Sequence, residues 1–483
     1  MLKRFGRDVA VYGGADLLFK LLQFAAIPLY SHRLGVAEFG LLALVTVSAA
    51  LAGIIVNLGV SYSVQRFYFD AEIDEARRPV LVTTGLVQLL VSGSVMLALL
   101  GLVLHGGQAH LASEYQLPWS FVAVGLLTVL PDQVAQYSLD TSRLQFSPWR
   151  FCAIAMVKNL LGLLIGLWLL LERDMGVLGL LVGNLVAALL AAPLGLWLIR
   201  RDLTPRIDRA YSAMMLRFGS PFIFTAAAYW IFASMDRWLL AELSDAVQVG
   251  LFSIAFKFAS VLTLVIVAFH QAWIPTAMRM AREEPRYRAL FAAIFDAWFC
   301  VLALMALAIA LFADEIMMLL TPEAYWPAAT ILAIGAAAVA VSGTTQITNL
   351  GLMLEKRTGL IALGAWIAAG TNVALNLLLI PRFGANGSAA ATLVSYCLLT
   401  GFFLVGSQRV HPLPLNHARL GFGLLVVLGA LAAPLVPDGA LLDPAWTAIK
   451  LAILFAVLLA AFLLGVVPPA LLRRLFVFRK SAP

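Results

Sequence analysis

Apolar runs of about 20 residues, the length that a helix needs to cross a membrane, recur along the whole chain with short polar breaks between them. Of the 483 residues, 62% are hydrophobic and only 12% are charged, a balance that soluble domains do not have. The period-2 alternation of β-barrel strands is absent from the sequence. The sequence therefore predicts an all-α polytopic membrane protein.

The apolar runs predict about fourteen transmembrane helices. The predicted spans are residues 9–31, 40–62, 80–104, 118–139, 150–171, 176–199, 219–241, 249–273, 290–313, 327–350, 359–380, 385–407, 417–436 and 445–467. With the N-terminus in the cytoplasm, the loops predicted to lie outside hold just Arg33, Arg173 and Arg382, and the 25 other Lys and Arg residues in the loops, the termini and the cytoplasmic ends of spans fall inside. This bias favours an even number of spans with both termini in the cytoplasm.

The first apolar run contains Asp16 and Lys20 and lacks a small-residue cleavage site. We therefore expect it to remain as a helix rather than to be removed as a signal peptide. The same run is expected to end near Pro28, to turn at His32–Gly35 and to restart at Phe39–Gly40. The net charge of +7 is explained by topology and by attraction to anionic lipid headgroups, so we expect no nucleic-acid partner.

Three short segments recur in the same order, about 210 residues later in the chain. The pairs are Val36–Leu41 with Ala246–Leu251, Leu144–Arg150 with Leu354–Arg357, and Gly176–Gly179 with Gly384–Gly387. They predict the duplication of a six-helix unit, with substrate bound between two parallel repeats. We expect an N-lobe at 1–210, a C-lobe at 211–412, and an appended pair of helices with a basic cytoplasmic tail at 413–483.

Lys20 lies in the middle of the first predicted span. Asp16 precedes it by four residues and Gln23 follows it by three, so all three share one face of a helix. One interpretation is an Asp16–Lys20 pair that neutralises itself and packs. The other is that this face lines a water-filled cavity, because ionisable groups inside a membrane are by default functional.

Two further lysines lie within predicted spans. Lys158 is eight residues into span 5 and either lines the cavity or extends its stem toward the membrane surface. Lys257 is eight residues into span 8, with no acidic residue three or four positions away, and is predicted to contact substrate. The deep charges are mainly cationic, which suits an anionic ligand such as a phosphate or diphosphate.

Asp236 and Arg237 stand together near the end of span 7, where they form either a surface ion pair or part of the substrate and coupling site. Asp132 follows Pro131 in span 4, and a kink with a carboxylate is a candidate for ion coupling. No ATP-binding motif occurs, so uphill transport would need an ion gradient, with no motif to choose between H⁺ and Na⁺. The six histidines are scattered, and we expect neither a metal site nor a cofactor.

Several motifs resemble those of the polysaccharide-biosynthesis flippases, within the multidrug/oligosaccharidyl-lipid/polysaccharide exporter superfamily. They are Tyr30–Gly40, Gly219–Pro221, Asp236–Arg237, Val249–Lys257, and the series Asn372, Asn376, Pro381, Gly384 and Gly387. The resemblance covers nearly the whole chain, and the order and spacing of the motifs are more specific than any single one.

The resemblance implies two six-helix lobes around a central cavity with alternating access. It implies transfer of undecaprenyl-diphosphate-linked oligosaccharide across the bacterial inner membrane, with a polysaccharide polymerase and glycosyltransferases as further partners. Related lipid II flippases hold the diphosphate with cavity arginines of helices 1 and 8, and Lys20 and Lys257 fall at roughly those places. Lysine keeps the charge but lacks the two-pronged guanidinium.

The same sequence features bear on three alternatives to a flippase. A multidrug exporter of the same fold would need an acidic cavity for cationic drugs, whereas the deep charges here are mainly cationic. A membrane polysaccharide polymerase or ligase would need a sizeable outer loop with catalytic residues, and every predicted loop is short. A scaffold for a polysaccharide assembly complex is the third. The sequence thus favours a transporter rather than an enzyme.

Overall fold

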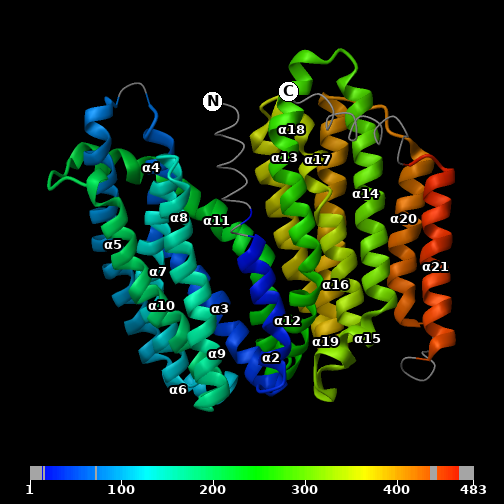
Figure 1. The fold of residues 1–483 in the computed structure, drawn as a ribbon, viewed down its shortest axis with the longest axis horizontal. Coiled ribbons are helices and arrows are strands. Elements are labelled where there is room, and N and C mark those ends of the chain that lie inside the picture. Colours follow the sequence, from blue (N-terminus) through cyan, green and yellow to red (C-terminus); the bar gives the residue numbers. More distant parts are fainter. Residues whose placement is uncertain (1–13, 15–16, 71–72, 436–442, 467–483) are drawn as a thin grey trace. The chain divides into compact units, whose positions relative to one another are not determined.

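The computed structural model of the chain describes residues 14, 17–70, 73–435 and 443–466, and within these residues all regular structure is helical. The chain divides into two compact units, Met1–Gly250 and Leu251–Pro483 (Figure 1). The first unit holds α2 (Ile27–Ser31), α3 (Val36–Asn57), α4 (Val60–Phe67), α5 (Arg78–Gly106), α6 (Gln108–Tyr115), α7 (Trp119–Leu144), α8 (Pro148–Ala155), the π-helical segment η2 (Met156–Leu161), α9 (Gly162–Glu172), α10 (Gly176–Ile199) and α11 (Arg209–Leu243).

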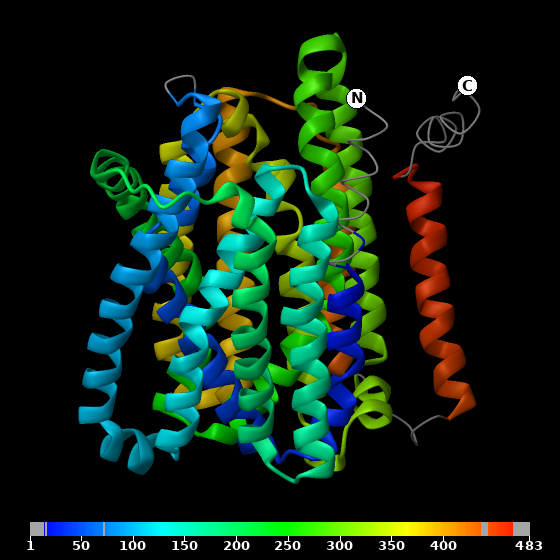
Figure 2. The same cartoon turned by 60° about the vertical axis from the view of Figure 1, so that its left-hand side comes forward.

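Helix α12 (Ala246–Ala259) runs across the boundary between the two units. The second unit continues with α13 (Val261–Glu283), α14 (Tyr287–Leu311), α15 (Ala313–Leu320), α16 (Ala328–Ser342), α17 (Thr345–Thr348), α18 (Leu350–Leu354), α19 (Thr358–Val410), α20 (His417–Ala432) and α21 (Pro444–Leu463). Figure 2 shows the helices of each unit from a second side.

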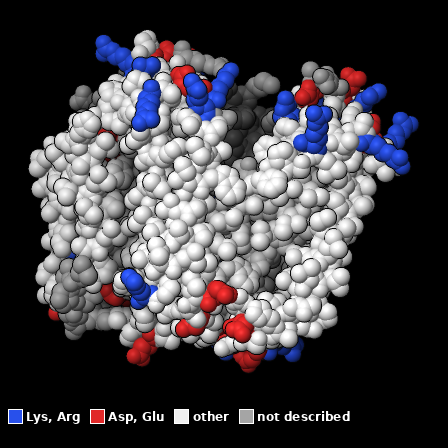
Figure 3. All heavy atoms as spheres, turned by 180° about the vertical axis from the view of Figure 1, so that it is seen from behind, with Lys and Arg blue, Asp and Glu red and all other residues white. Residues whose placement is uncertain are grey.

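Ten helices of the described chain are long and apolar enough to cross a membrane, or eleven if the bent pair α6–α7 counts as one span. Leu17–Ser31, Ala246–Ala259 and His417–Ala432 are shorter apolar helices. Figure 3 shows most of the charged side chains of one face near its top and bottom, with a broad band between them that is almost free of charge. The prediction of an all-α multi-pass membrane protein is confirmed, while the total of fourteen spans and the sides of the termini stay predictions.

The first membrane stretch differs in detail from the prediction. A turn at Ala26 interrupts its helix, which resumes as α2 and ends at Ser31. Pro28 does not end it, because this proline lies in the first turn of α2, where a missing N–H costs nothing. The turn at His32–Gly35 is present, but α3 already begins at Val36. Gly35 caps that helix by donating its backbone N–H to Glu38 Oε2 at 2.9 Å.

Two glycines allow the starts of α3 and α12 to touch backbone to backbone. A Cβ added to Gly40 would overlap the carbonyl oxygen of Ala246, and a Cβ added to Gly250 would overlap the carbonyl oxygen of Val36. These four residues come from the predicted repeat, in which Val36 corresponds to Ala246 and Gly40 to Gly250. The contact is therefore reciprocal: each glycine meets the first residue of the other copy.

Helix α11 packs against α3 and α4 within the first unit. The indole N–H of Trp230 donates to the carbonyl of Val47 at 2.8 Å, and Ser63 Oγ donates to the carbonyl of Met215 at 2.8 Å. The contacts between residues therefore divide the chain after residue 250, whereas the sequence repeat predicts a boundary between the lobes at 210. The contacts do not test that boundary, which stays a prediction.

The chain bends by 117° between α6 and α7. Near this bend the Tyr115 hydroxyl of α6 donates a hydrogen bond to the Glu242 carboxylate of α11. That hydrogen bond to Glu242 raises the pKa of Tyr115 to about 12. The contact ties the short helix to α11, so it fixes one end of the first unit.

In the second unit, the single long helix α19 contains two predicted spans that meet at Gly384. This residue has φ 53° and ψ −133°, a backbone conformation that residues with a side chain rarely adopt. The C-terminal helices are joined to the same unit by two ion pairs. Lys450 Nζ of α21 lies 2.6 Å from Glu315 Oε1 of α15, and Arg419 of α20 lies 3.7 Å from Asp296 of α14.

Candidate functional site

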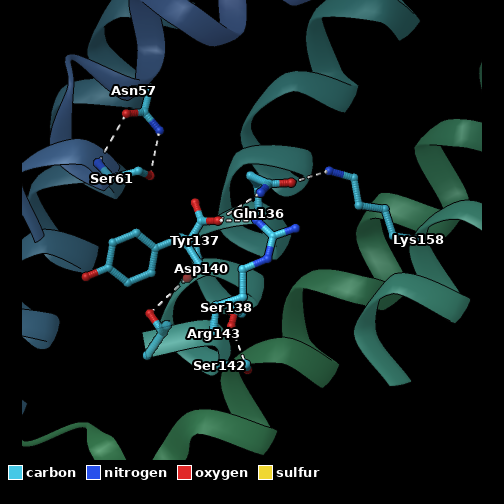
Figure 4. Close-up of polar contacts among 10 residues, drawn as sticks. Asn57, Ser61, Gln136, Tyr137, Ser138, Asp140, Ser142, Arg143 and Lys158 are labelled. Carbon is cyan, nitrogen blue, oxygen red and sulfur yellow. Dashed lines mark hydrogen bonds and ion pairs between the residues drawn. The ribbon is translucent and has the colours of Figure 1, made fainter. Parts of the chain in front are cut away.

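A stripe of polar side chains follows one face of α7. Asp132, Gln136, Asp140 and Arg143 are spaced by four, four and three residues, which places them above one another on a helix. Gln136 Nε2 donates to Asp140 Oδ1 at 3.1 Å, and Arg143 Nη1 lies 3.3 Å from the same oxygen. The polar groups of this stripe therefore compensate one another inside an apolar unit (Figure 4).

Lys158 reaches this stripe from the neighbouring helical segment. Its Nζ lies 2.9 Å from Asp132 Oδ1 and 3.4 Å from Gln136 Oε1, and Figure 4 shows the side chain extending toward Gln136. Lys158 lies on η2, the π-helical segment between α8 and α9. Single π-helical turns inside α-helices occur frequently at functional sites.

Both ends of the Lys158–Asp132 pair come from irregular helix. Asp132 directly follows Pro131, which removes one backbone hydrogen bond from α7. The Lys158 side chain is 16% exposed and that of Asp132 is 36% exposed, so the pair is accessible on its carboxylate side. Chemically, this arrangement can exchange its internal ion pair for a bound anion on Lys158 or for a cation or proton on Asp132.

A cavity of about 390 Å³ lies beside the stripe, between α3, α4, α7 and α11. We call it the amide pocket, because four side-chain amides line it together with the Asp140–Arg143 pair and two aromatic rings. Its polar and aromatic lining residues are Asn57, Ser61, Gln65, Gln133, Gln136, Asp140, Arg143, Tyr62 and Phe222. Gln136 contacts Lys158 and also lines the amide pocket, so the ion pair and the cavity form one polar region.

The amides of the pocket are organised by Asn57, at the end of α3. Its Nδ2 donates to Ser61 Oγ at 3.0 Å and to Gln133 Oε1 at 2.9 Å, and its Oδ1 accepts from the backbone N–H of Ser61 at 3.3 Å. The chain turns sharply just after Asn57, where Leu58 and Gly59 both have positive φ. The turn brings α4 back over the pocket and fixes the Asn57 side chain.

The structure places the predicted residues of the first span as follows. Lys20 is half-buried and Gln23 is exposed, both on the helix Leu17–Ser31. Asp16 lies outside the described residues, so the choice between an Asp16–Lys20 pair and a cavity-lining face stays open. Lys20 belongs to the first unit and Lys257 to the second.

The two other cations predicted to bind substrate, Lys257 and Arg237, differ in their exposure. Lys257 is exposed in the last turn of α12, where its charge is favourable to the helix dipole. Arg237 is half-buried in α11 and donates to the carbonyl of Ala233 at 2.9 Å. Its neighbour Asp236 is only 2% exposed, so these adjacent residues are in different environments. Their roles in binding and coupling stay predictions.

The structure brings together two residues that the sequence suggested separately, Lys158 and Asp132. The sequence interpretation missed Gln136, Asp140 and Asn57. For the first two there was a signal, since Asp132, Gln136 and Asp140 recur at the helical spacing of four within one span. Asn57 gave no such signal, because its position depends on how α3 packs against α7.

We expect the Lys158–Asp132 pair to show coupling in a double-mutant cycle. Asp132→Ala leaves the Lys158 ammonium without its carboxylate and should lower the melting temperature, and the added Lys158→Ala should restore part of the loss. Because the pair is partly exposed, we expect a coupling energy of about 1–2 kcal/mol, below the about 3–5 kcal/mol cost of breaking a fully buried pair. Thermal unfolding of the four proteins in detergent measures it.

The control is the exposed pair Arg33–Asp174, with 3.6 Å between its atoms and side chains that are 50% and 83% exposed. Its cycle should give no more than about 0.5 kcal/mol. Strictly additive effects of Asp132→Ala and Lys158→Ala would contradict the importance of the ion pair.

The sequence of the chain is similar to those of known proteins. A family model described as "Polysaccharide biosynthesis protein" matches residues 5–281. The chain is also 24% identical, over 285 residues, to protein 1 of the Lsg locus of Haemophilus influenzae. That alignment covers 56% of this chain, and the chain spans 65% of the length of that relative.

Solved structures share the fold at low sequence identity. The lipid II flippase MurJ in an inward closed conformation has a TM-score of 0.72 and 10% identity, covering 93% of this chain and 97% of that one. An inward-facing multidrug resistance MATE family transporter of the MOP superfamily has a TM-score of 0.64 and 12% identity, covering 81% and 94%. At these identities the likeness concerns the fold.

Proposed function

The chain belongs to the polysaccharide biosynthesis protein family, and from this premise we propose that it moves undecaprenyl-diphosphate-linked oligosaccharide from the cytoplasmic to the periplasmic leaflet of the bacterial inner membrane. Family membership is the observation that carries the proposal, and it confirms the family resemblance read from the sequence. The fold shared with a lipid II flippase and with MATE transporters supports a transporter rather than an enzyme.

The charges within the helices support an anionic substrate. Lys20, Lys257 and Arg237 are the cations that we propose to contact the diphosphate. Lys158 already lies 2.9 Å from Asp132, so its charge is partly offset, and a diphosphate would have to compete with that carboxylate. We therefore propose that Lys158 joins the substrate site through the polar stripe of α7.

Physical chemistry explains why such a substrate needs a protein. A diphosphate with several sugars cannot cross hydrocarbon unaided, since an uncompensated charge there is very costly. Polar side chains on the inner faces of helices can replace the water around the headgroup, while the lipid tail stays in the bilayer. Energy would come from an H⁺ or Na⁺ gradient, with Asp132 and Asp236 as candidate coupling residues, or from consumption of the product by a polymerase.

The test is transport by the purified chain in proteoliposomes. We expect it to expose a fluorescent undecaprenyl-diphosphate-linked oligosaccharide to a reagent on the far side of the membrane, without lengthening the oligosaccharide and without exporting the cationic dye ethidium. Dye export without lipid transfer would favour the multidrug exporter instead. Longer oligosaccharides after incubation would favour the polymerase.

A further inference from the structure

We propose that the amide pocket of the first unit is a subsite for one sugar ring of the lipid-linked oligosaccharide. The inference rests on the proposed function and deepens it, because it assigns the sugar to residues other than the cations proposed to bind the diphosphate. The hydrogen-bonding groups of the pocket lining, its aromatic rings and its size support this assignment.

The amides match the hydrogen-bonding character of a sugar. A sugar hydroxyl both donates and accepts, and each Asn or Gln side chain carries both a carbonyl oxygen and an NH₂ group. Four such side chains surround this one cavity: Asn57, Gln65, Gln133 and Gln136. Such groups are costly in an apolar unit unless they are satisfied by one another or by a ligand.

One of these amides faces a gap that a glycine provides. A Cβ added to Gly53 of α3 would lie 2.8 Å from Gln133 Nε2, so this amide is placed where only a glycine leaves it room. Gln133 is held from the other side, since its Oε1 accepts from Asn57 at 2.9 Å. The orientation of the Gln133 amide is therefore fixed before any ligand binds.

Two aromatic rings line the pocket together with the amides. Tyr62 and Phe222 line the pocket, and their rings are stacked with centroids 5.5 Å apart and an angle of 17° between planes. Both rings are accessible, with 55% of Tyr62 and 38% of Phe222 exposed. The face of an aromatic ring is electron-rich and attracts the weakly positive C–H face of a pyranose.

The rings continue away from the pocket as a row. Phe222 lies 5.2 Å from Phe218, and Phe218 lies 5.2 Å from Phe67, between ring centroids. A row of rings beside polar groups gives successive sugars repeated contacts of one kind. This suits a substrate that has several sugars and has to move.

The size and the polar lining of the amide pocket favour a sugar ring over an acyl chain as its occupant. The cavity of about 390 Å³ lies at the lower end of the range usual for small-molecule sites, about 300–1,000 Å³. A second cavity of the same unit, of about 200 Å³, is lined by Val45, Leu51, Ile55 and other apolar residues and is suited to a hydrocarbon chain. The amides gather instead at the cavity next to the Lys158–Asp132 pair.

The test measures binding of four lipids to the full chain in nanodiscs. The probes are undecaprenyl diphosphate alone and the same lipid carrying glucose, galactose or N-acetylglucosamine. A few added hydrogen bonds and a ring contact should make at least one sugar form bind about 10-fold or more tightly than the sugar-free lipid. Equal binding of all four lipids to the unaltered protein would overturn the subsite, and binding of none would overturn the proposed function itself.

Variants of the pocket residues test whether the tighter binding of a sugar-bearing lipid comes from the amide pocket. In the unaltered protein, the dissociation constant of the sugar-free lipid should exceed that of the best sugar-bearing lipid about 10-fold. Phe222→Ala should reduce this ratio to about 2 or less and leave the affinity for the sugar-free lipid unchanged. The matched control is Phe224→Ala, on the same helix, where the side chain is 72% exposed and does not line the pocket. Equal effects of Phe222→Ala and Phe224→Ala would contradict the assignment.

A second variant tests the sugar subsite independently, in case Phe222→Ala does not fold. Gly53→Ala adds one methyl group that displaces the Gln133 amide, and it should also remove most of the gain from the sugar. Its control, Gly101→Ala, adds a methyl group on α5 that would meet just one atom, Leu126 Cδ1 at 4.0 Å. A Gly53→Ala protein that keeps the full sugar preference would show that the amides do not bind sugar.

Discussion

Replacing Lys257 with alanine is expected to abolish transport of the lipid-linked oligosaccharide in proteoliposomes while the protein still folds and inserts. Lys257 is exposed in the last turn of α12, so replacing it leaves no cavity in the buried core. A hydrogen bond to a charged group contributes about 1.5–3 kcal/mol, so losing one contact to the diphosphate should weaken binding about 10- to 150-fold. We expect Lys20→Ala to have the same effect.

Lysine-to-arginine variants distinguish the effect of the positive charge from that of the shape of the donor group. Lys257→Arg and Lys20→Arg should retain partial transport, because the cation remains while the shape of the donor group changes. Arg382→Ala removes an exposed cation of the second unit that is not proposed to contact substrate, and should transport normally. Normal transport by both alanine variants would refute the proposed role of these lysines.

Gly40→Ala and Gly250→Ala are expected to reduce the yield of folded protein severely. In each case the new methyl group meets backbone atoms of the opposite helix rather than the end of a flexible side chain. An extra methyl group in a filled space usually lowers the free energy of unfolding by about 1–3 kcal/mol, and by more where the backbone cannot move. We therefore expect each variant to lower the free energy of unfolding by about 3 kcal/mol. Monodisperse yield and melting temperature in detergent are the measurements.

Gly101→Ala serves as the comparison, because it adds the same methyl group to a helix with almost nothing near it. It should fold with an unchanged or slightly higher melting temperature, since alanine favours helix over glycine. Melting temperatures of Gly40→Ala and Gly250→Ala equal to that of Gly101→Ala would mean that the two helices are not in contact.

The predicted spans coincide with helices because the length of an apolar run and the pattern of polar breaks are properties of the sequence alone. Residues 359–380 and 385–407, for example, fall on the two parts of α19, and Gly384, in the predicted break between these spans, has the non-helical backbone. The first helix was predicted to end near Pro28, whereas it has a turn at Ala26 and resumes as α2 to Ser31. Proline breaks the interior of a helix but is accepted in its first turn, and the sequence did not show that α2 begins just before it.

The candidate site was less predictable than the fold. The sequence identified Asp132 and Lys158 as unusual charges, but their pairing depends on how two helices pack, over a separation of 26 residues in the chain. The π-helical turn that carries Lys158 has no compositional signature. A polar spacing of four along α7 could have pointed to Gln136 and Asp140, whereas the amide pocket requires side chains from four helices.

The reciprocal contact of Gly40 and Gly250 has a consequence for the origin of the chain. If the two halves arose from one gene, residue 40 of one copy now meets residue 36 of the other, and the reverse, as in an isologous dimer. One glycine codon of the unduplicated gene would then have set both sides of this contact, whereas each glycine of the present chain can change independently of the other.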